Sequence, residues 1–573
     1  MSEVLVDKAR AWAAGDPDPE TRAELEAIIK RGDTDELSER MHAPLEFGTA
    51  GLRGMVGAGI NRMNRAVIRR TTRGLADYLL TLPDARSLPV VVGYDGRTTS
   101  RQFAEDTVGV LAAAGLTVRY FDSPVPTPLV AYAARQLAAI AAVVITASHN
   151  PPEYNGYKVY APNAAQIIPP VDGRIAHFIE QVGAAKDVPL LEGAMHGRSD
   201  KVERVPDSLF ERYLMELDAI RPKGPADADF GIVYTPMHGV GWRFAQRALA
   251  HAGYSRVTVV PEQAEPDGRF PTVRFPNPEE PGALDLAKAL ADQEKAELVI
   301  ANDPDADRLA ICVPTVTGRW VQLTGNQVGL LLSDFVLEHA AARPTPLVLS
   351  SIVSSPMLGA IARAHGAAFE QTLTGFKWIW NAALDLELAG GVRYAFGYEE
   401  ALGYSVGHIV RDKDGISAAV LFADLASRCR AQGMSVLERL EALYGKHGLW
   451  SSLQKSILRP GTEGQGQIAQ AMQKLGADIP AELAGHKVLG SVDYRSGGGE
   501  RPRWLPDTSL VVLELEGDSR VLVRPSGTEP KLKIYVDLRV ELAADDIVAS
   551  REDGAQQAAA AIADAIAAHV GLA

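Results

Sequence analysis

One loop carries three aspartates at alternating positions, directly after the apolar run Leu298–Ala301. The three are Asp303, Asp305 and Asp307. An extended or gently curved loop turns alternate side chains to the same side. Carboxylates about 4 Å apart repel one another by several kcal/mol per pair at an effective dielectric of about 20. Because a hard cation removes that cost, the pattern favours a metal site over a solvated acidic turn.

The ligand types of this loop indicate which cation it would hold. An EF-hand calcium loop that begins at Asp303 needs Gly at its sixth position and Glu at its twelfth, but the chain has Arg308 and Pro314 there. All the candidate ligands are oxygens, and neither His nor Cys is among them, so magnesium is favoured over zinc. The sequence therefore predicts a Mg²⁺ site made by the aspartate triplet.

A serine hydroxyl follows a second apolar run. Ser148 lies close in sequence to His149 and Lys158, and the Asn-Gly pair at 155–156 predicts a turn in the loop. A serine in a turn is more often a local hydrogen-bonding group, but a hydroxyl at the end of a strand can also be a nucleophile. The Gly-x-Ser-x-Gly elbow is absent, so acyl transfer by a hydrolase triad is not indicated.

A later loop collects hydrogen-bond donors that suit a phosphate. It contains Arg524, Ser526, Gly527 and Thr528. The guanidinium can bind two phosphate oxygens at once, and the hydroxyls and backbone N–H groups can form an anion nest. The Gly-Lys-Ser/Thr ending of a P-loop is missing. We expect a phosphate cradle here, with an ordinary β-turn as the alternative.

Two further stretches give weaker signals. Glu399 and Glu400 follow an apolar run and are flanked by glycines. They could hydrogen-bond neighbouring sugar hydroxyls, although paired glutamates are more often surface charge. Residues 47–54 form a glycine-rich loop that carries Arg53, and by itself this loop could be only a turn.

The loops follow short apolar runs that alternate with helical patterns. We expect strands within 88–93, 137–146, 230–234, 296–301 and 346–351. The segments between them, such as 100–114 and 282–294, are mostly rich in Ala and Leu and have helical periodicity. Strands separated by helices predict α/β domains with parallel or mixed sheets.

Both ends of the chain differ from this pattern. The first forty residues predict helices, with Asp18 as an N-cap, Pro19 at the first helical position and Gly32 as a stop. Beyond about residue 446, strands expected at 511–515, 520–523 and 532–538 lie close together. An Ala-rich helix is expected at 555–569. This C-terminal part is therefore predicted to be α+β.

The bulk composition excludes several classes of protein. The 573 residues predict three to five domains. The net charge of -14 argues against a nucleic-acid or membrane partner, although a few Arg and Lys could still bind a phosphorylated small molecule. The two cysteines cannot build a disulfide framework or a cysteine zinc site. We see no signal core or membrane span and expect a cytoplasmic protein; nothing indicates its oligomeric state.

Taken together, the loops closely resemble those of the α-D-phosphohexomutase superfamily, which includes phosphoglucomutases and phosphomannomutases. They occur in the superfamily's order, at 146–151, 303–308, 397–403 and 524–528. The resemblance implies four domains around a central cleft: three similar mixed-sheet α/β domains and a C-terminal α+β domain like the TATA-binding protein. We place them at 41–206, 207–324, 325–446 and 447–573, after a helical extension at 1–40.

The resemblance also implies a role for each matching residue. Ser148 would carry a phosphoryl group, and one of its oxygens would join the three aspartates around Mg²⁺. Its neighbours would be Arg53, Arg308, a candidate acid or base, Lys158, and a supporting group, His149. Sugar hydroxyls would be contacted by Glu399, aided by Thr374, with His408 and Lys413 on the substrate side. The phosphate that is not transferred would be held by Arg524, Ser526, Gly527 and Thr528.

One departure from the superfamily pattern bears on the substrate. Many members carry a serine two residues after the sugar-binding glutamate, and this chain has Ala401 there. The strings GYEEALGY, TLTGFK and FGTAGLRG are more similar to the subgroup with phosphopentomutase-type and bacterial glucose-selective enzymes. A strict phosphomannomutase is therefore less well supported.

The predicted function is that of a phosphoglucomutase, an isomerase. It would interconvert glucose 1-phosphate and glucose 6-phosphate through a phosphoserine, with glucose 1,6-bisphosphate as intermediate and activator. The alternatives are a phosphopentomutase acting on ribose or deoxyribose phosphates, a phosphomannomutase and a glucose 1,6-bisphosphate synthase. A catalytically silent sugar-phosphate-binding protein is an alternative from another class, against which Ser148 and the complete aspartate triplet argue.

Overall fold

Two units make up the structure, a computed structural model that describes residues 3–46, 51–222, 229–526, 531–543 and 546–572. The first unit consists of Met1–Leu323 and Gly403–Ser427. The second consists of Thr324–Leu402 and Arg428–Ala573. One short segment, 403–427, thus belongs to the first unit although the chain on both sides of it belongs to the second.

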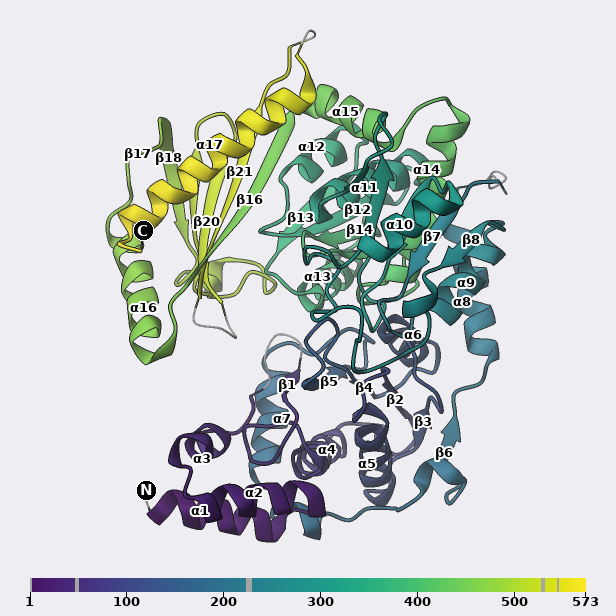
Figure 1. Ribbon diagram of the computed structural model, residues 1–573, viewed down its shortest axis with the longest axis vertical. Coiled ribbons are helices and arrows are strands. Elements are labelled where there is room, and N and C mark those ends of the chain that lie inside the picture. The colour runs from purple at the N-terminus through teal and green to yellow at the C-terminus, as the bar shows by residue number, and fades with distance from the viewer. Residues whose placement is uncertain (1–2, 47–50, 223–228, 527–530, 544–545, 573) are drawn as a thin grey trace. The chain divides into compact units, whose positions relative to one another are not determined.

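Three helices open the first unit: α1 (Glu3–Gly15), α2 (Pro19–Arg31) and α3 (Thr34–Met41). The predicted signals at the ends of α2 are confirmed: the Asp18 side chain accepts a backbone N–H of the first turn, Pro19 begins the helix and Gly32 ends it at a φ of 69°. Leu25 and Ile28 lie in a small apolar core shared by the three helices, and α1 and α2 lie side by side (Figure 1).

The first sheet has the order β1-β5-β4-β2-β3-β6. Its strands are β1 (Leu52–Met55), β2 (Val90–Tyr94), β3 (Val118–Tyr120), β4 (Ala141–Ile145), β5 (Tyr154–Tyr160) and β6 (Val202–Arg204). The strands β2, β3, β4 and β6 are parallel. At one edge of the sheet β5 runs antiparallel to β4, and β1 runs antiparallel to β5. The helices of this part are α4 (Arg65–Leu79), α5 (Ser100–Ala113), α6 (Thr127–Gln136), α7 (Val171–Glu180) and α8 (Ser208–Ile220).

The second sheet has the order β11-β10-β9-β7-β8. Its strands are β7 (Ile232–Thr235), β8 (Val257–Val259), β9 (Leu298–Ala301), β10 (Ala310–Pro314) and β11 (Trp320–Gln322). The helices are α9 (Trp242–His251) and α10 (Asp285–Glu294). This sheet is also mixed, because β7, β8 and β9 are parallel, β10 runs antiparallel to β9, and β11 runs antiparallel to β10.

In both sheets a buried parallel strand is followed by a loop and then by an antiparallel neighbour. The buried strand β4 is followed by residues 146–153 and then by its antiparallel neighbour β5. In the same way β9 is followed by residues 302–309 and then by β10. Ser148 and the aspartate triplet therefore lie at the carboxyl ends of parallel strands, which is where ligands bind in open α/β sheets.

The second unit begins with a third α/β region. Its parallel strands β12 (Thr345–Ser351), β13 (Ala368–Thr372) and β14 (Val392–Glu399) have the order β13-β12-β14. The helices are α11 (Gly325–His339), α12 (Met357–Ala364), α13 (Phe376–Ala389) and α15 (Val436–His447). Between β14 and α15, the strand β15 (Gly403–Val406) and most of α14 (Gly415–Ala431) belong to the first unit.

The C-terminal part of the second unit has a different architecture, as predicted. Its antiparallel sheet has the order β16-β21-β20-β19-β18-β17. The strands are β16 (Leu449–Leu458), β17 (Glu482–Leu483), β18 (His486–Asp493), β19 (Val511–Leu515), β20 (Arg520–Pro525) and β21 (Lys531–Val540), and the helices are α16 (Gly461–Ala477) and α17 (Val548–His569). The long α17 lies along this sheet (Figure 1) and contacts β16 and β21.

One local prediction is wrong. The Asn-Gly pair at 155–156 lies inside β5 and makes no turn. Gly156 pairs with Arg53 of β1, and a Cβ at Gly156 would stand 2.5 Å from the carbonyl oxygen of Thr146 and 2.8 Å from that of Leu52. A glycine is therefore required here by the close approach of two neighbouring backbones, which also explains glycine inside a strand.

No helix in the described part of the chain is both long enough and apolar enough to span a bilayer.

Candidate active site

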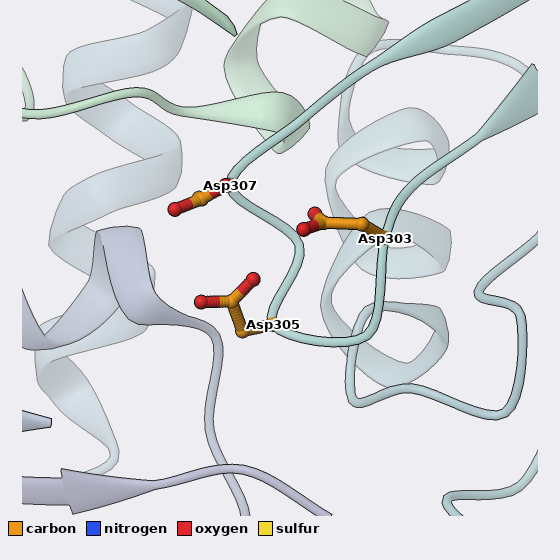
Figure 2. A group of neighbouring side chains, drawn as sticks. All are labelled: Asp303, Asp305 and Asp307. Atoms are coloured by element: carbon orange, nitrogen blue, oxygen red, sulfur yellow. The ribbon is translucent and has the colours of Figure 1, made fainter. Parts of the chain in front are cut away.

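The aspartate triplet forms a compact cluster in the loop after β9 (Figure 2). One carboxylate oxygen from each of Asp303, Asp305 and Asp307 lies within 4.8 Å of the others, and all three side chains are buried. The loop is curled more tightly than an extended segment, because Ala306 has a φ of 55° and its N–H bonds to the Asp303 carbonyl at 2.8 Å. This curl gathers all three carboxylates around one point.

The charges of the cluster are unevenly balanced. Burial, followed by the charges of the two other carboxylates, raises the pKa of Asp303 well above its usual range. Burial also opposes ionisation of Asp307, but the cations Lys158, Lys413 and Arg308 outweigh it and lower the pKa of this carboxyl group. The pKa of Asp305 is lowered as well, because Lys158 outweighs burial and the charge of Asp307.

The residues of the cluster can hold a divalent cation. The Oδ1 atoms of Asp305 and Asp307 are buried and accept no hydrogen bond from any described residue. Buried carboxylate oxygens are normally satisfied, and a metal ion satisfies them as well as a donor does. Three carboxylates with only oxygen ligands suit Mg²⁺.

Ser148 lies against this cluster. Its Oγ donates a hydrogen bond to Oδ2 of Asp303 at 2.6 Å, although the two residues come from different sheets. The backbone of Ser148 has a φ of 51°, which is uncommon for a residue with a Cβ, and its N–H is held by Oγ1 of Thr146 at 2.8 Å. The structure thus brings the candidate nucleophile and the candidate metal ligands into one group, which we call the serine–aspartate centre.

His149 also contacts the serine hydroxyl. Its Nδ1 is 3.1 Å from Oγ of Ser148, and its Nε2 is 3.4 Å from Nη2 of Arg308. Burial, followed by the charges of Arg308 and Arg53, lowers the pKa of His149 well below its usual range. A guanidinium can only donate, so Nε2 accepts and the neutral ring carries its proton on Nδ1, from which it donates to the serine oxygen.

Two lysines face the aspartates. Nζ of Lys158, on β5, is 2.9 Å from Oδ2 of Asp305 and 3.0 Å from Oδ2 of Asp307. Lys413, in the segment 403–427, reaches Oδ2 of Asp307 at 3.2 Å. Burial opposes the charge of Lys158, but the two carboxylates outweigh it and raise its pKa. In this arrangement Lys158 is a protonated ammonium group, which can donate a proton but has no lone pair with which to accept one.

The segment with Lys413 is held by a buried carboxylate. Asp412 accepts hydrogen bonds from the Tyr160 hydroxyl and from Nε2 of Gln166, both at 2.6 Å. Its other oxygen accepts the backbone N–H of Lys413 at 2.7 Å. The same segment carries His408, which is half-buried just after β15.

Sequence reasoning missed two supporting residues. Oγ1 of Thr127, at the start of α6, donates to Oδ2 of Asp305 at 2.8 Å. Arg97, just after β2, donates to several backbone carbonyls of the loop that carries Ser148. Arg97 could have been suspected, because it follows a predicted strand at the sheet edge that carries Ser148, whereas nothing in the sequence distinguishes Thr127. The predicted Arg53 donates to Oδ1 of Asn150 in the same loop, at 3.0 Å.

The remaining predicted residues lie in the second unit. Nη1 of Arg524 donates to Oγ1 of Thr374 at 2.8 Å, and Glu399, at the end of β14, accepts the N–H of Gly375 at 2.5 Å. Ser526 follows β20, and its N–H bonds to the carbonyl of Lys531. We call Thr374, Glu399, Arg524 and Ser526 the Thr374–Arg524 group. Gly527 and Thr528 lie outside the described residues.

The neighbouring Glu400 forms hydrogen bonds with two serines. Its Oε2 accepts hydrogen bonds from the hydroxyls of Ser351 at 3.0 Å and Ser354 at 3.2 Å. Its backbone N–H donates to Oγ of Ser354. The pair of glutamates is therefore divided, with Glu400 supporting the loop and Glu399 facing Gly375.

Four family descriptions match the chain in order. The phosphoglucomutase/phosphomannomutase alpha/beta/alpha domains I, II and III match residues 44–186, 211–318 and 324–447. The phosphoglucomutase/phosphomannomutase C-terminal domain matches residues 468–554. The three α/β regions and the α+β region of the structure thus correspond to the four domains of one family.

Similar proteins cover nearly the whole chain. It is 39% identical over 568 residues to "Probable phosphoribomutase" of Schizosaccharomyces pombe, with 96% of each chain covered. It is 40% identical over 500 residues to "Probable phosphomannomutase" of Haemophilus influenzae, covering 86% of this chain and 96% of the relative. Among solved structures, the phosphoglucomutase parafusin of Paramecium has the same fold, with a TM-score of 0.68 at 19% identity over 92% of this chain and 97% of its own.

Proposed function

Since the chain belongs to the phosphoglucomutase/phosphomannomutase family of sugar-phosphate mutases, we propose that it transfers a phosphoryl group between two positions of a sugar by way of Ser148. The observation that carries this proposal is the 2.6 Å hydrogen bond from Oγ of Ser148 to Asp303. It links a candidate nucleophile to three buried carboxylates that can hold a cation.

Asp303, Asp305 and Asp307 would hold Mg²⁺ together with an oxygen of the serine phosphate. When bound, the ion would neutralise charge on the phosphoryl group, and this is the main requirement of phosphoryl transfer. Arg53 and Arg308 would add positive charge beside the same phosphate. His149 donates to the serine oxygen and would orient it.

The reaction has two half-reactions. Phospho-Ser148 gives its phosphoryl group to the free terminal hydroxyl of a sugar 1-phosphate: the bond from phosphorus to the serine oxygen breaks, and a bond to the sugar oxygen forms. Lys158, protonated in this arrangement, would donate to the departing serine oxygen. The amine that this leaves would take up the proton that the sugar hydroxyl gives up, so that no net proton is gained or lost. The resulting bisphosphate then turns end for end and returns its 1-phosphate to Ser148. The product that leaves is the sugar with a phosphate on its terminal hydroxyl.

The Thr374–Arg524 group would bind the rest of the substrate. Arg524 and Ser526, with Gly527 and Thr528, would hold the phosphate that is not transferred, and a guanidinium suits this task because it binds two oxygens at once. Glu399 and Thr374 would contact sugar hydroxyls. His408 and Lys413 would lie on the substrate side of the serine–aspartate centre.

We propose glucose 1-phosphate as the substrate, with glucose 1,6-bisphosphate as intermediate and activator. The strings around Glu399 and Arg53 support this choice over mannose, since they resemble the subgroup of phosphopentomutase-type and bacterial glucose-selective enzymes, but they do not separate glucose from a pentose. A pentose phosphate is the second candidate, since the relative named as a phosphoribomutase is 39% identical over 96% of the chain. The name of the Haemophilus influenzae relative adds mannose 1-phosphate to the substrates that require testing.

One experiment separates these candidates. Values of kcat/KM are measured with glucose 1-phosphate, ribose 1-phosphate and mannose 1-phosphate, each with and without added glucose 1,6-bisphosphate. The highest value on glucose 1-phosphate supports the proposal, and a higher value on ribose 1-phosphate replaces it. Net production of glucose 1,6-bisphosphate from another phosphoryl donor would indicate a synthase. No turnover of any sugar would favour a silent binding protein.

A further inference from the structure

A single guanidinium, that of Arg97, organises the loop that carries Ser148. Its Nη2 donates to the carbonyl oxygen of Ser148 at 2.7 Å and also to that of Asn150. Its Nη1 donates to the carbonyl oxygens of Pro151 at 2.7 Å and Tyr154 at 2.9 Å. The loop therefore folds around one cation, which binds three of its carbonyl oxygens and that of Tyr154 at the start of β5.

Arg97 is itself held from several directions. Its backbone N–H bonds to Oδ1 of Asp95 at 3.0 Å, and its Nε lies 3.3 Å from Oδ2 of the same carboxylate. The guanidinium lies over the ring of Phe270, with 5.1 Å from Cζ to the ring centroid. The backbone of Gly268 comes so close that a Cβ there would stand 2.7 Å from Cα of Arg97. With only 4% of its surface exposed, Arg97 has little room to move.

Ser148 needs such a support because its backbone is strained. A φ of 51° for a non-glycine residue costs free energy unless its surroundings hold it. Thr146 holds the N–H side of the residue and Arg97 holds its carbonyl side. In this conformation the hydroxyl points to Asp303.

We propose that Arg97 is a positioning residue for phosphoryl transfer: it fixes the backbone of Ser148 in the left-handed conformation that directs the hydroxyl to the aspartate triplet. This inference rests on the proposed function of Ser148. It goes beyond that function because the hydrogen bonds of the Arg97 guanidinium go to backbone carbonyls and not to the Ser148 hydroxyl or the aspartates of the triplet.

A rate measured in a single turnover distinguishes positioning from a purely structural role. The phosphoenzyme is prepared with glucose 1,6-bisphosphate, freed of excess ligand, and mixed rapidly with the sugar phosphate of highest kcat/KM in the presence of Mg²⁺. The amplitude reports how many molecules are competent, whereas the rate constant reports the geometry within each competent molecule. Loss of folded protein lowers the amplitude alone.

The variants are Arg97→Gln, Arg97→Lys and a matched control, Arg501→Gln. Arg501 lies in the second unit and also donates to three backbone carbonyls, those of Tyr494, Ser496 and Leu505. It also lies over an aromatic ring, that of Tyr494, at 4.7 Å. The control thus removes a similar set of contacts far along the chain from Ser148.

We expect Arg97→Gln to lower the single-turnover rate constant by about 100-fold, because misplacing a reacting group by about 1 Å has an effect of this size. Arg97→Lys should restore part of the loss, and Arg501→Gln should leave the rate constant unchanged. A wild-type rate constant in Arg97→Gln, with only the amplitude reduced, would overturn the inference. If Arg97→Gln does not fold, the single-turnover rate constant of Arg97→Lys is compared with that of the wild type, and an unchanged rate constant would overturn the inference. A wild-type chain that never becomes phosphorylated would instead refute the proposed function.

Discussion

The serine–aspartate centre and the Thr374–Arg524 group differ in how far their side chains are exposed. Ser148 and the three aspartates are each at most 3% exposed. In the Thr374–Arg524 group Glu399 is also buried, at 7% exposed, but Thr374, Arg524 and Ser526 are half-buried. Charges interact more strongly away from water, and a transferred phosphoryl group must be kept from hydrolysis. Partly exposed donors suit a different task, which is to bind a phosphate that is presented from either end of the sugar. The difference agrees with the proposed division between chemistry at the serine–aspartate centre and recognition at the Thr374–Arg524 group.

The serine–aspartate centre is supported by several elements of the first unit. Asp305 alone accepts hydrogen bonds from Thr127 at 2.8 Å and Thr146 at 3.3 Å, and pairs with Lys158. These partners come from α6, from the loop after β4 and from β5, so several elements must fold before the carboxylate is held. Such preorganisation lowers the cost of reaching the reactive geometry.

The sequence predicted the serine–aspartate centre better than its supports. Alternating aspartates after an apolar run predicted a cluster, and the structure gathers them. The local signals at Asp18 and Gly32 were likewise sufficient, because caps act within one helical turn. The Asn-Gly pair at 155–156 led to a wrong prediction of a turn. The contacts that require Gly156 come from Leu52 and Thr146, and such tertiary contacts leave no local pattern in the sequence. Thr127 was missed for the same reason, whereas Arg97 follows the strand predicted within 88–93 and could have been suspected from that position.

The largest expected effect tests the chemical side of the comparison. Ser148→Ala removes the oxygen that would carry the phosphoryl group, and we expect turnover to fall by at least roughly 10⁴-fold, as for other nucleophile deletions. Circular dichroism and the unfolding temperature should remain close to those of the wild type. A variant with near-normal turnover would show that Ser148 is not the nucleophile.

Asp305→Asn tests whether the buried cluster binds the metal. Losing one charged ligand should cost several kcal/mol of transition-state stabilisation, which lowers kcat by about 10²- to 10³-fold and raises the Mg²⁺ concentration needed for half-maximal rate. Asp16→Asn is a matched control, since Asp16 is a buried carboxylate held by Thr21 in the N-terminal helices. An unchanged Mg²⁺ dependence in Asp305→Asn would contradict its role as a ligand.

Arg524→Gln tests the recognition side. Hydrogen bonds to a charged group are each worth about 1.5–3 kcal/mol, so losing the guanidinium should raise KM by about 10- to 100-fold. The rate at which phospho-Ser148 transfers its phosphoryl group at saturating substrate should change far less. If kcat fell with KM unchanged, the proposed division between the two groups would be wrong.

Thr127→Val gives the smallest expected effect. It removes one hydrogen bond to Asp305 while nearly preserving the size of the side chain, and loss of such a partner should weaken Mg²⁺ binding by about tenfold. Thr107→Val is the control, because the buried Thr107 hydroxyl donates to the Phe103 carbonyl within α5 and lies near the Tyr157 hydroxyl rather than an aspartate of the triplet. Equal Mg²⁺ affinities in the two variants would mean that Thr127 does not support the centre.

The central claim is that Ser148 carries a phosphoryl group beside a metal-binding aspartate cluster. Intact-mass measurement of the chain after incubation with glucose 1,6-bisphosphate and Mg²⁺ tests it most directly. We predict a gain of one phosphoryl group, located on Ser148, that is discharged on addition of the sugar phosphate when Mg²⁺ is present. A chain whose mass does not change under these conditions would contradict the claim.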